Sequence, residues 1–181
     1  MMTEGGNLYL VGMPGAGKSA IGRHLARELG REFVDADAEI EKRTGAAIAT
    51  IFDIEGEAQF RRRESEVLRG LSGGGGLVVA TGGGVVLAAE NRAVMRGSGF
   101  VVYLETPPEI LKQRAARNTG RPLLDGADAQ ERGEKIEQLL QERAPLYRAL
   151  ADLVVTPGES SAQVAAKEIA MMAKKLCKPS L

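Results

Sequence analysis

The residues from Gly12 to Ser19 follow the spacing G-x-x-x-x-G-K-[ST]. This spacing is typical of a loop that binds nucleotide phosphates, because its glycines let several backbone N–H groups point inward at phosphate oxygens. In such a loop Lys18 reaches the β- and γ-phosphates, and the Ser19 hydroxyl binds Mg²⁺. The stretch therefore predicts a nucleoside triphosphate site, and the alternative is an ordinary glycine turn. The predicted nucleotide-binding residues of the loop are Gly12, Gly15, Ala16, Gly17, Lys18 and Ser19.

Two carboxylates, Asp35 and Asp37, follow a predicted strand at 31–35. A carboxylate beside the loop can hold Mg²⁺ through its waters, and another can orient a hydroxyl that attacks the γ-phosphate and accept its proton. The next predicted strand ends in Thr81 rather than in an aspartate, which favours Asp35 for the metal. For Asp37 the alternative is that it caps the following helix.

Other polar stretches also have two interpretations. The run Arg61–Arg63 is a solvated helix face, or Arg61 turns inward, is held by Glu64 three residues later, and grips a carboxylate. The triplet Gly82–Gly84 is a close approach of ligand to backbone, or a simple turn. The segment 118–128 is long and polar, so we expect a mobile lid that brings Arg121 onto the transferred phosphoryl group.

Apolar runs alternate with helical patterns throughout the chain. Strands are predicted at 8–11, 31–35, 77–81, 100–105 and 153–155; helices are predicted at 18–29, 38–43, 48–54, 57–71, 88–96, 107–117, 129–150 and 161–176. This order predicts a three-layer α/β/α domain around a parallel sheet of about five strands. Ligands bind such sheets at the carboxyl ends of the strands, where the loop, the two aspartates and the glycine triplet all lie.

The composition excludes several classes. A chain of 181 residues fits one domain, 1–181, and its formal net charge of zero gives no field that attracts nucleic acid or an anionic membrane. The chain has no tryptophan and only 4% aromatic residues, which counts against a surface that stacks bases. One cysteine excludes an internal disulfide, and no apolar run approaches the roughly 20 residues of a membrane span. We therefore expect a cytoplasmic monomer without nucleic-acid or membrane partners.

Six motifs in this order resemble the shikimate kinases, a family of small P-loop NTPases related to the nucleoside monophosphate kinases. They are G-M-P-G-A-G-K-S at 12–19, F-V-D-A-D at 33–37, F-R-R-R-E at 60–64, T-G-G-G at 81–84, N-T-G-R-P-L-L at 118–124 and E-R-A-P-L-Y at 142–147. The resemblance covers residues from about Leu8 to Ala170. It implies a strand order of 2-3-1-4-5, a shikimate-binding helical segment at 37–64 and a lid at 118–128.

The resemblance also implies an activity, ATP-dependent phosphorylation of the 3-hydroxyl of shikimate on the route to aromatic amino acids, with Mg²⁺ as cofactor. Asp37 would hold the acceptor hydroxyls and act as the base or orient them. The other acceptor residues implied are Arg61, Arg143, Gly83, Gly84, Phe52 and Phe60, with the two arginines on the carboxylate. On local sequence alone, Arg143 would be placed on a helix surface.

On the donor side, Lys18 and Arg121 would stabilise phosphoryl charge, while Ser19 would bind Mg²⁺ with Asp35 acting through water. Arg114 would lie against adenine, and Pro157 would close the base pocket. Two rival functions remain: a kinase for another small acceptor such as gluconate or a nucleoside monophosphate, and a non-catalytic shikimate-binding regulatory domain. Two arginines around one carboxylate argue against a neutral acceptor.

Overall fold

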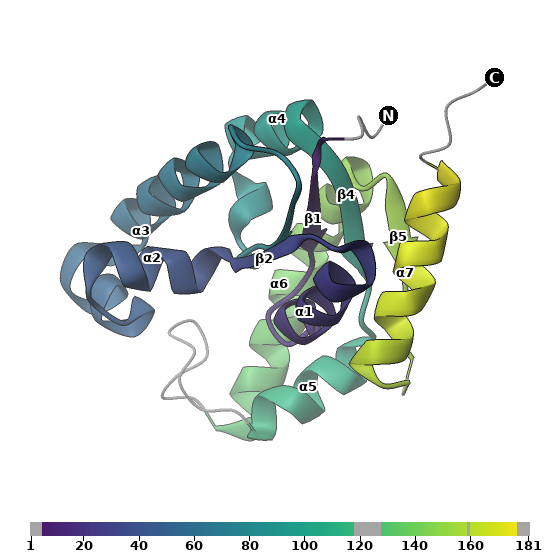
Figure 1. The fold of residues 1–181 in the computed structure, drawn as a ribbon. Helices are drawn as coiled ribbons and strands as arrows, with labels where there is room; N and C mark the ends of the chain where they lie inside the picture. Colours follow the sequence, from purple (N-terminus) through teal and green to yellow (C-terminus); the bar gives the residue numbers. More distant parts are fainter. Residues whose placement is uncertain (1–4, 118–127, 159, 177–181) are drawn as a thin grey trace.

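The computed structural model describes residues 5–117, 128–158 and 160–176, which form a five-stranded parallel sheet between helices (Figure 1). The strands are β1 (Asn7–Val11), β2 (Glu32–Asp35), β3 (Leu77–Ala80), β4 (Gly99–Leu104) and β5 (Leu153–Val155). Their order is β2-β3-β1-β4-β5, with Leu8 paired to Val78 on one side and to Phe100 on the other. The predicted fold class and strand order are confirmed. The predicted lid, with Arg121, lies outside the described residues except for Asp128.

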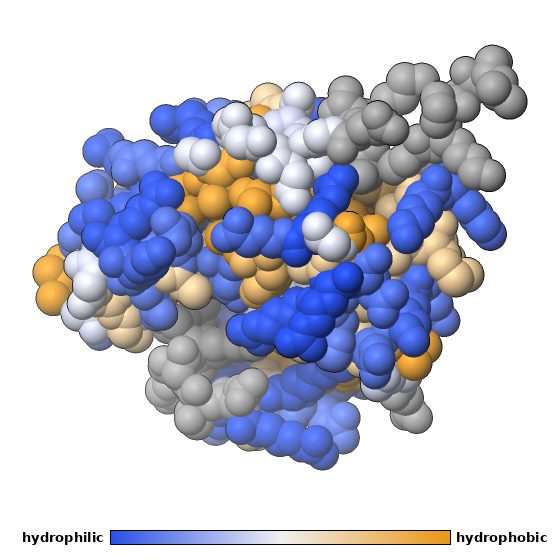
Figure 2. All heavy atoms as spheres, viewed as in Figure 1, coloured by the Kyte–Doolittle hydropathy of each residue, from blue (hydrophilic) through white to orange (hydrophobic). Residues whose placement is uncertain are grey.

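The helices are α1 (Lys18–Leu29), α2 (Ala36–Thr44), α3 (Ile48–Ser72), α4 (Ala89–Ser98), α5 (Pro108–Arg117), α6 (Ala129–Leu150) and α7 (Ala162–Leu176), with a short 3₁₀ turn at Val85–Leu87. Alternation along β1 divides the core: Leu8 and Leu10 pack in the layer of α1 and α7, whereas Tyr9 and Val11 pack in the layer that contains α3, α4 and α6. Polar residues dominate the face in Figure 2, and hydrophobic residues show between the helices. Among the described residues, no helix is both long and apolar enough to cross a bilayer.

Two helix boundaries near the predicted site are informative. α3 is interrupted at Gly56, whose φ of 79° and ψ of 169° are not helical, so the predicted separation into two helices is confirmed. α2 begins two residues earlier than predicted, because Asp35 caps it by accepting hydrogen bonds from the N–H groups of Asp37 and Ala38 at 3.1 and 3.2 Å. The interpretation of Asp37 as the cap is wrong, and its side chain is left for another role.

A buried polar network joins several elements near the amino-terminal ends of β1, β3 and β4. The fully buried Asn7 donates from Nδ2 to the Leu71 carbonyl of α3 at 2.9 Å and accepts from the Leu77 N–H of β3 at 3.0 Å. Its Nδ2 also donates to the Tyr9 hydroxyl, which pairs with Ser98 Oγ at 2.7 Å. Asn7 therefore ties the end of α3 to the start of β3, at the edge of the sheet away from the predicted chemistry.

Candidate active site

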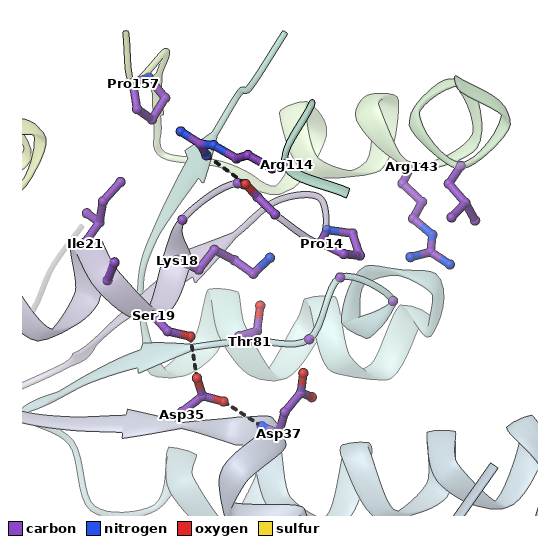
Figure 3. Close-up of a pocket in the computed structure, with 18 of the residues that line it drawn as sticks. Pro14, Lys18, Ser19, Ile21, Asp35, Asp37, Thr81, Arg114, Arg143 and Pro157 are labelled. Carbon is purple, nitrogen blue, oxygen red and sulfur yellow. Dashed lines mark hydrogen bonds between the residues drawn. The ribbon is translucent and has the colours of Figure 1, made fainter. Parts of the chain in front are cut away.

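A cavity of about 610 Å³ opens at the carboxyl ends of the strands. It is lined by every site residue predicted from the sequence that lies in the described ranges, except Gly12. Gly12 instead packs against β4, where a Cβ would lie 2.8 Å from the Leu104 carbonyl oxygen, and its φ of 150° also favours glycine. Figure 3 shows Lys18, Arg114 and Pro157 in one part of the cavity and Arg143 in another, with Asp37 below.

The glycine loop encloses the Lys18 ammonium. Nζ of Lys18 donates to the carbonyl oxygens of Gly12 and Met13 at 2.7 and 2.8 Å, and the residue is only 9% exposed. Gly15 and Gly17 each have a φ of 90°, a backbone conformation that L side chains rarely adopt. The loop ends at the first turn of α1, so backbone N–H groups and the positive end of the helix face the same region. This arrangement suits a polyphosphate.

Arg114 joins the loop from a distant part of the chain. Its Nη1 donates to the Gly15 carbonyl oxygen at 2.7 Å, across 99 positions of sequence. Pro157, just after β5, is buried and lines the same part of the cavity. A flat guanidinium and a proline ring on the outer side of the loop are suited to hold the base of a nucleotide.

Ser19 and Asp35 form the junction between the loop and the second strand. The Ser19 hydroxyl donates to Oδ2 of Asp35, while Oδ1 of the same carboxylate caps α2 (Figure 3). The hydrogen bond uses the proton of Ser19, so the oxygen keeps its lone pairs for a cation. No group of three or more His, Cys, Asp or Glu side chains in the described ranges could hold a metal by itself. A hydroxyl with a carboxylate behind it fits Mg²⁺, which keeps several waters and takes other ligands from phosphates.

Asp37 is the carboxylate that points into the cavity. Its Oδ1 is buried and accepts no hydrogen bond within the described part of the chain. Burial raises the pKa of Asp37, and the neighbouring Asp35 raises it further, while Lys18 and Arg61 oppose both. An unpaired carboxylate with a raised pKa, beside a phosphate-binding loop, is able to take a proton from a bound hydroxyl.

The arginine run on α3 divides as the second interpretation predicted. Arg61 turns inward, donates to Glu64 at 2.9 Å and to Glu57 at 3.1 Å, and lies 5.3 Å from the ring centre of Phe60. Arg62 is exposed, and Arg63 forms two hydrogen bonds of 2.8 Å with Glu55 across the break at Gly56. Phe52 lies 4.6 Å from Phe60 between ring centres and completes an apolar wall.

The glycine triplet after β3 makes room for protein side chains. A Cβ on Gly82 would lie 2.5 Å from Oε1 of Glu64 and 3.0 Å from Oδ1 of Asp37. A Cβ on Gly83 would lie 2.7 Å from the Pro14 ring, and one on Gly84 would overlap the Arg61 guanidinium. The triplet forms a turn, and it permits close approaches to these four residues. It thereby brings the acidic, loop and arginine parts of the cavity together.

Arg143 is the residue that local sequence would have misplaced. It is 2% exposed on α6 and lines the cavity opposite Lys18, so its guanidinium is buried rather than solvated. Its charge lowers the pKa of the buried Glu64, although burial raises that pKa overall. Two arginines thus reach one region of the cavity, which suits a carboxylate ligand.

Sequence reasoning missed several residues that line the cavity. They include Pro14, Thr81, Leu139 and Arg117, and Glu64 was expected only as a partner of Arg61. Glu64 is 2% exposed, and its Oε1 accepts no hydrogen bond within the described ranges. A charge four residues after the apolar Phe60 is the one signal that could have placed Glu64 on the buried face of α3.

Comparison with known proteins agrees with this geometry. A family model described as shikimate kinase matches residues 14–173. A shikimate kinase from Pseudoalteromonas translucida is 51% identical over 168 residues, covering 93% of this chain and 96% of that protein. One from Vibrio cholerae is 48% identical over 171 residues, with 94% and 97% covered. The solved structure of the shikimate kinase from Acinetobacter baumannii in complex with shikimate matches with a TM-score of 0.92 at 44% identity, covering 97% of both chains.

Proposed function

Because this chain belongs to the shikimate kinase family, we propose that one half of its cavity binds the phosphoryl donor and the other half binds the acceptor. The chain phosphorylates shikimate at the expense of ATP. The oxygen of the shikimate 3-hydroxyl attacks the γ-phosphorus, the bond to the β-phosphate oxygen breaks, and ADP leaves. The observation that carries the assignment is the pair of inward arginines, Arg61 and Arg143, in the same cavity as the phosphate-binding loop.

The acceptor half holds shikimate by its carboxylate and one face of its ring. Arg61 and Arg143 bind the carboxylate, and Gly83 and Gly84 add backbone contacts. The two tilted aromatic rings of Phe52 and Phe60 pack against the shikimate ring. With the carboxylate fixed at one end, the hydroxyls at the other end of the ring face Asp37.

Asp37 accepts the hydrogen bond of the attacking hydroxyl and receives its proton as the new P–O bond forms. Its buried, unpartnered Oδ1 is the acceptor available for this step, and its raised pKa increases its affinity for the proton. A substrate hydroxyl that donates to Oδ1 also removes the energetic cost of leaving that oxygen without a partner.

The donor half holds ATP in the glycine loop, where the residues in contact are Gly12, Gly15, Ala16, Gly17, Lys18 and Ser19. Lys18 stabilises the negative charge on the transferred group, and Arg114 and Pro157 enclose the base. Arg121 is proposed as a further cation for the same charge. Ser19 binds Mg²⁺, and Asp35 fixes the Ser19 hydroxyl from behind. Bound Mg²⁺ supplies neutralisation of phosphate charge.

The experiment that tests this function is an ADP-release assay with shikimate, gluconate and AMP in parallel. We expect turnover with shikimate and only background release with the other two acceptors. Mass spectrometry of the product should show one added phosphoryl group. Release with gluconate or AMP that equals release with shikimate would assign the cavity to another acceptor, and binding of shikimate without any ADP release would identify a regulatory domain.

A further inference from the structure

Tyr147 lies directly behind the acceptor half of the cavity. It is fully buried on α6, four residues after Arg143, so the two side chains lie on the same side of the helix. Its ring stacks on Tyr103 of β4, with ring centres 5.0 Å apart and planes inclined by 26°. The stacking fixes where the Tyr147 hydroxyl can reach.

The hydroxyl of Tyr147 contacts one group of the proposed acceptor site and is affected by the charge of a second. It donates a hydrogen bond to the carbonyl oxygen of Gly83. The positive charge of Arg143 lies close enough to this hydroxyl to lower its pKa. Burial nevertheless raises the pKa of Tyr147 well above its ordinary value, so the hydroxyl keeps the proton that it gives to Gly83.

The bond to Gly83 also sets the direction of the next amide. In a trans peptide the carbonyl of Gly83 and the N–H of Gly84 point in opposite directions. Gly83, Gly84 and Arg143 line the cavity, whereas Tyr147 lies behind them in the described part of the chain. A carbonyl drawn toward Tyr147 therefore turns the N–H of Gly84 away from the Tyr147 hydroxyl, and Gly84 itself lines the cavity.

We propose that Tyr147 is a positioning residue for the carboxylate of the acceptor. The hydroxyl holds the peptide between Gly83 and Gly84 beside the buried Arg143, so an amide donor and an arginine converge on the same anion. The inference rests on the proposed function, because it assumes that shikimate places its carboxylate between Arg61 and Arg143. Tyr147 acts through these groups and does not touch the substrate.

The substitution Tyr147→Phe removes only the hydroxyl and leaves the ring on Tyr103. We expect the KM for shikimate to rise about tenfold, the scale set by one lost hydrogen bond to a buried carbonyl beside the charge of Arg143. The KM for ATP should stay within about twofold, because the loop that binds ATP makes neither contact. Equal increases in both KM values would overturn the inference.

The matched control is Tyr9→Phe. Tyr9 is also a fully buried tyrosine, and its hydroxyl is hydrogen-bonded to Asn7 and Ser98 near the amino-terminal ends of the strands. Loss of this hydroxyl should lower the unfolding temperature while both KM values stay unchanged. A similar rise in the shikimate KM in Tyr9→Phe would show that the effect of Tyr147→Phe is a general loss of buried hydrogen bonds, and the inference would fail.

A second measurement isolates the carboxylate. The wild type and Tyr147→Phe are each titrated calorimetrically with shikimate and with its methyl ester. The four affinities form a thermodynamic cycle that measures the coupling between the Tyr147 hydroxyl and the charge of the shikimate carboxylate. We expect the substitution to weaken shikimate about tenfold and to leave the weaker ester nearly unchanged. Equal weakening of both ligands would overturn the inference. Wild-type protein without shikimate turnover would remove the proposed function and this inference together, whereas normal wild-type turnover with an unchanged shikimate KM in Tyr147→Phe would remove the inference alone.

Discussion

The guanidinium of Arg61 occupies the space that a side chain on Gly84 would need. A Cβ on Gly84 would lie 2.2 Å from Nη1 of Arg61 and 2.3 Å from its Cζ. Atoms cannot approach so closely, but the obstacle is the far end of a long side chain, which can move at little cost to the fold. The position of Arg61 therefore depends on the absence of one methyl group in another element.

We expect Gly84→Ala to displace Arg61 and to raise the KM for shikimate by about tenfold or more, the scale for a disturbed oriented charge pair. The KM for ATP should change by less than about twofold, and Arg61→Ala should give the same asymmetry. Steady-state kinetics with each substrate varied will measure both. Gly97→Ala is the control, because Gly97 lies in α4 with open space around it. An unchanged shikimate KM in Gly84→Ala would show that Arg61 does not bind the acceptor.

Asp37→Asn should lower turnover by about two powers of ten or more, the scale of a positioned general base, with ATP affinity nearly intact. The amide keeps the size of the carboxylate but cannot receive the proton. Turnover is measured at saturating shikimate and ATP, and nucleotide affinity by calorimetry. Asp53→Asn, on the exposed side of α3, should behave as the wild type. Near-normal turnover in Asp37→Asn would remove Asp37 from its proposed role.

The acid limb of the pH profile should report Asp37. Because burial raises its pKa, kcat/KM for shikimate should fall with decreasing pH at a higher pH than an ordinary aspartate would give. The limb should be absent from the residual activity of Asp37→Asn. A wild-type profile that is flat down to about pH 4, near the ordinary pKa of aspartate, would contradict the raised pKa.

The same shift predicts a gain in stability when Asp37 is neutralised. A carboxyl with a raised pKa binds its proton more tightly in the folded chain than in the unfolded chain. Its stabilising contribution to the free energy of unfolding is therefore fully present below the unfolded pKa and is lost as pH rises through the folded pKa. At about pH 7.5 to 8, Asp37→Asn should therefore unfold at a higher temperature than the wild type. The difference should shrink as the pH approaches about 4. If Asp37→Asn were less stable than the wild type at every pH, the buried Asp37 carboxylate would not be a source of instability.

Two substitutions separate the roles of Asp35. Asp35→Asn keeps a good helix cap but loses the acceptor of the Ser19 proton, so the half-saturating Mg²⁺ concentration should rise about tenfold or more at nearly unchanged stability. Asp35→Ala should show the same rise and also lose about 0.5–2 kcal/mol of stability from the missing cap. Asp152→Ala, which removes the acceptor of the Val101 N–H, is the control for stability without a metal effect. An unchanged half-saturating Mg²⁺ concentration in Asp35→Asn would show that Asp35 does not support Mg²⁺ binding.

Local signals predicted the elements of the chain and the phosphate-binding loop of the donor half. The loop at 12–19 carries its own spacing, and the break at Gly56 lies between two apolar patterns, so neither depends on distant residues. Local signals did not predict which way a side chain points where packing between distant elements decides its direction. Whether Asp35 or Asp37 caps α2 depends on which backbone N–H groups each oxygen can reach, and that depends on where β2 ends.

The acceptor half depended on the family motifs for the same reason. Arg143 is flanked by Glu142 and by the helical proline Pro145, a pattern that resembles a solvated surface. Its burial follows from contacts of α6 with distant elements. The spacing of Ile136, Leu139, Tyr147 and Leu150 places Arg143 on the apolar face of α6, but this spacing does not show what the face packs against. The glycine triplet likewise has a reason that appears only when Glu64, Pro14 and Arg61 are brought against it.

Asn7 holds one end of the second half of α3, and Arg61 lies toward the other end. The end of α3 at Asn7 is held by the bond from Asn7 to Leu71, and Arg61 lies ten residues away, about 15 Å along a helix. The hydrogen bond of Asn7 thus fixes, from the opposite edge of the sheet, one end of the helix that carries Arg61 at the cavity.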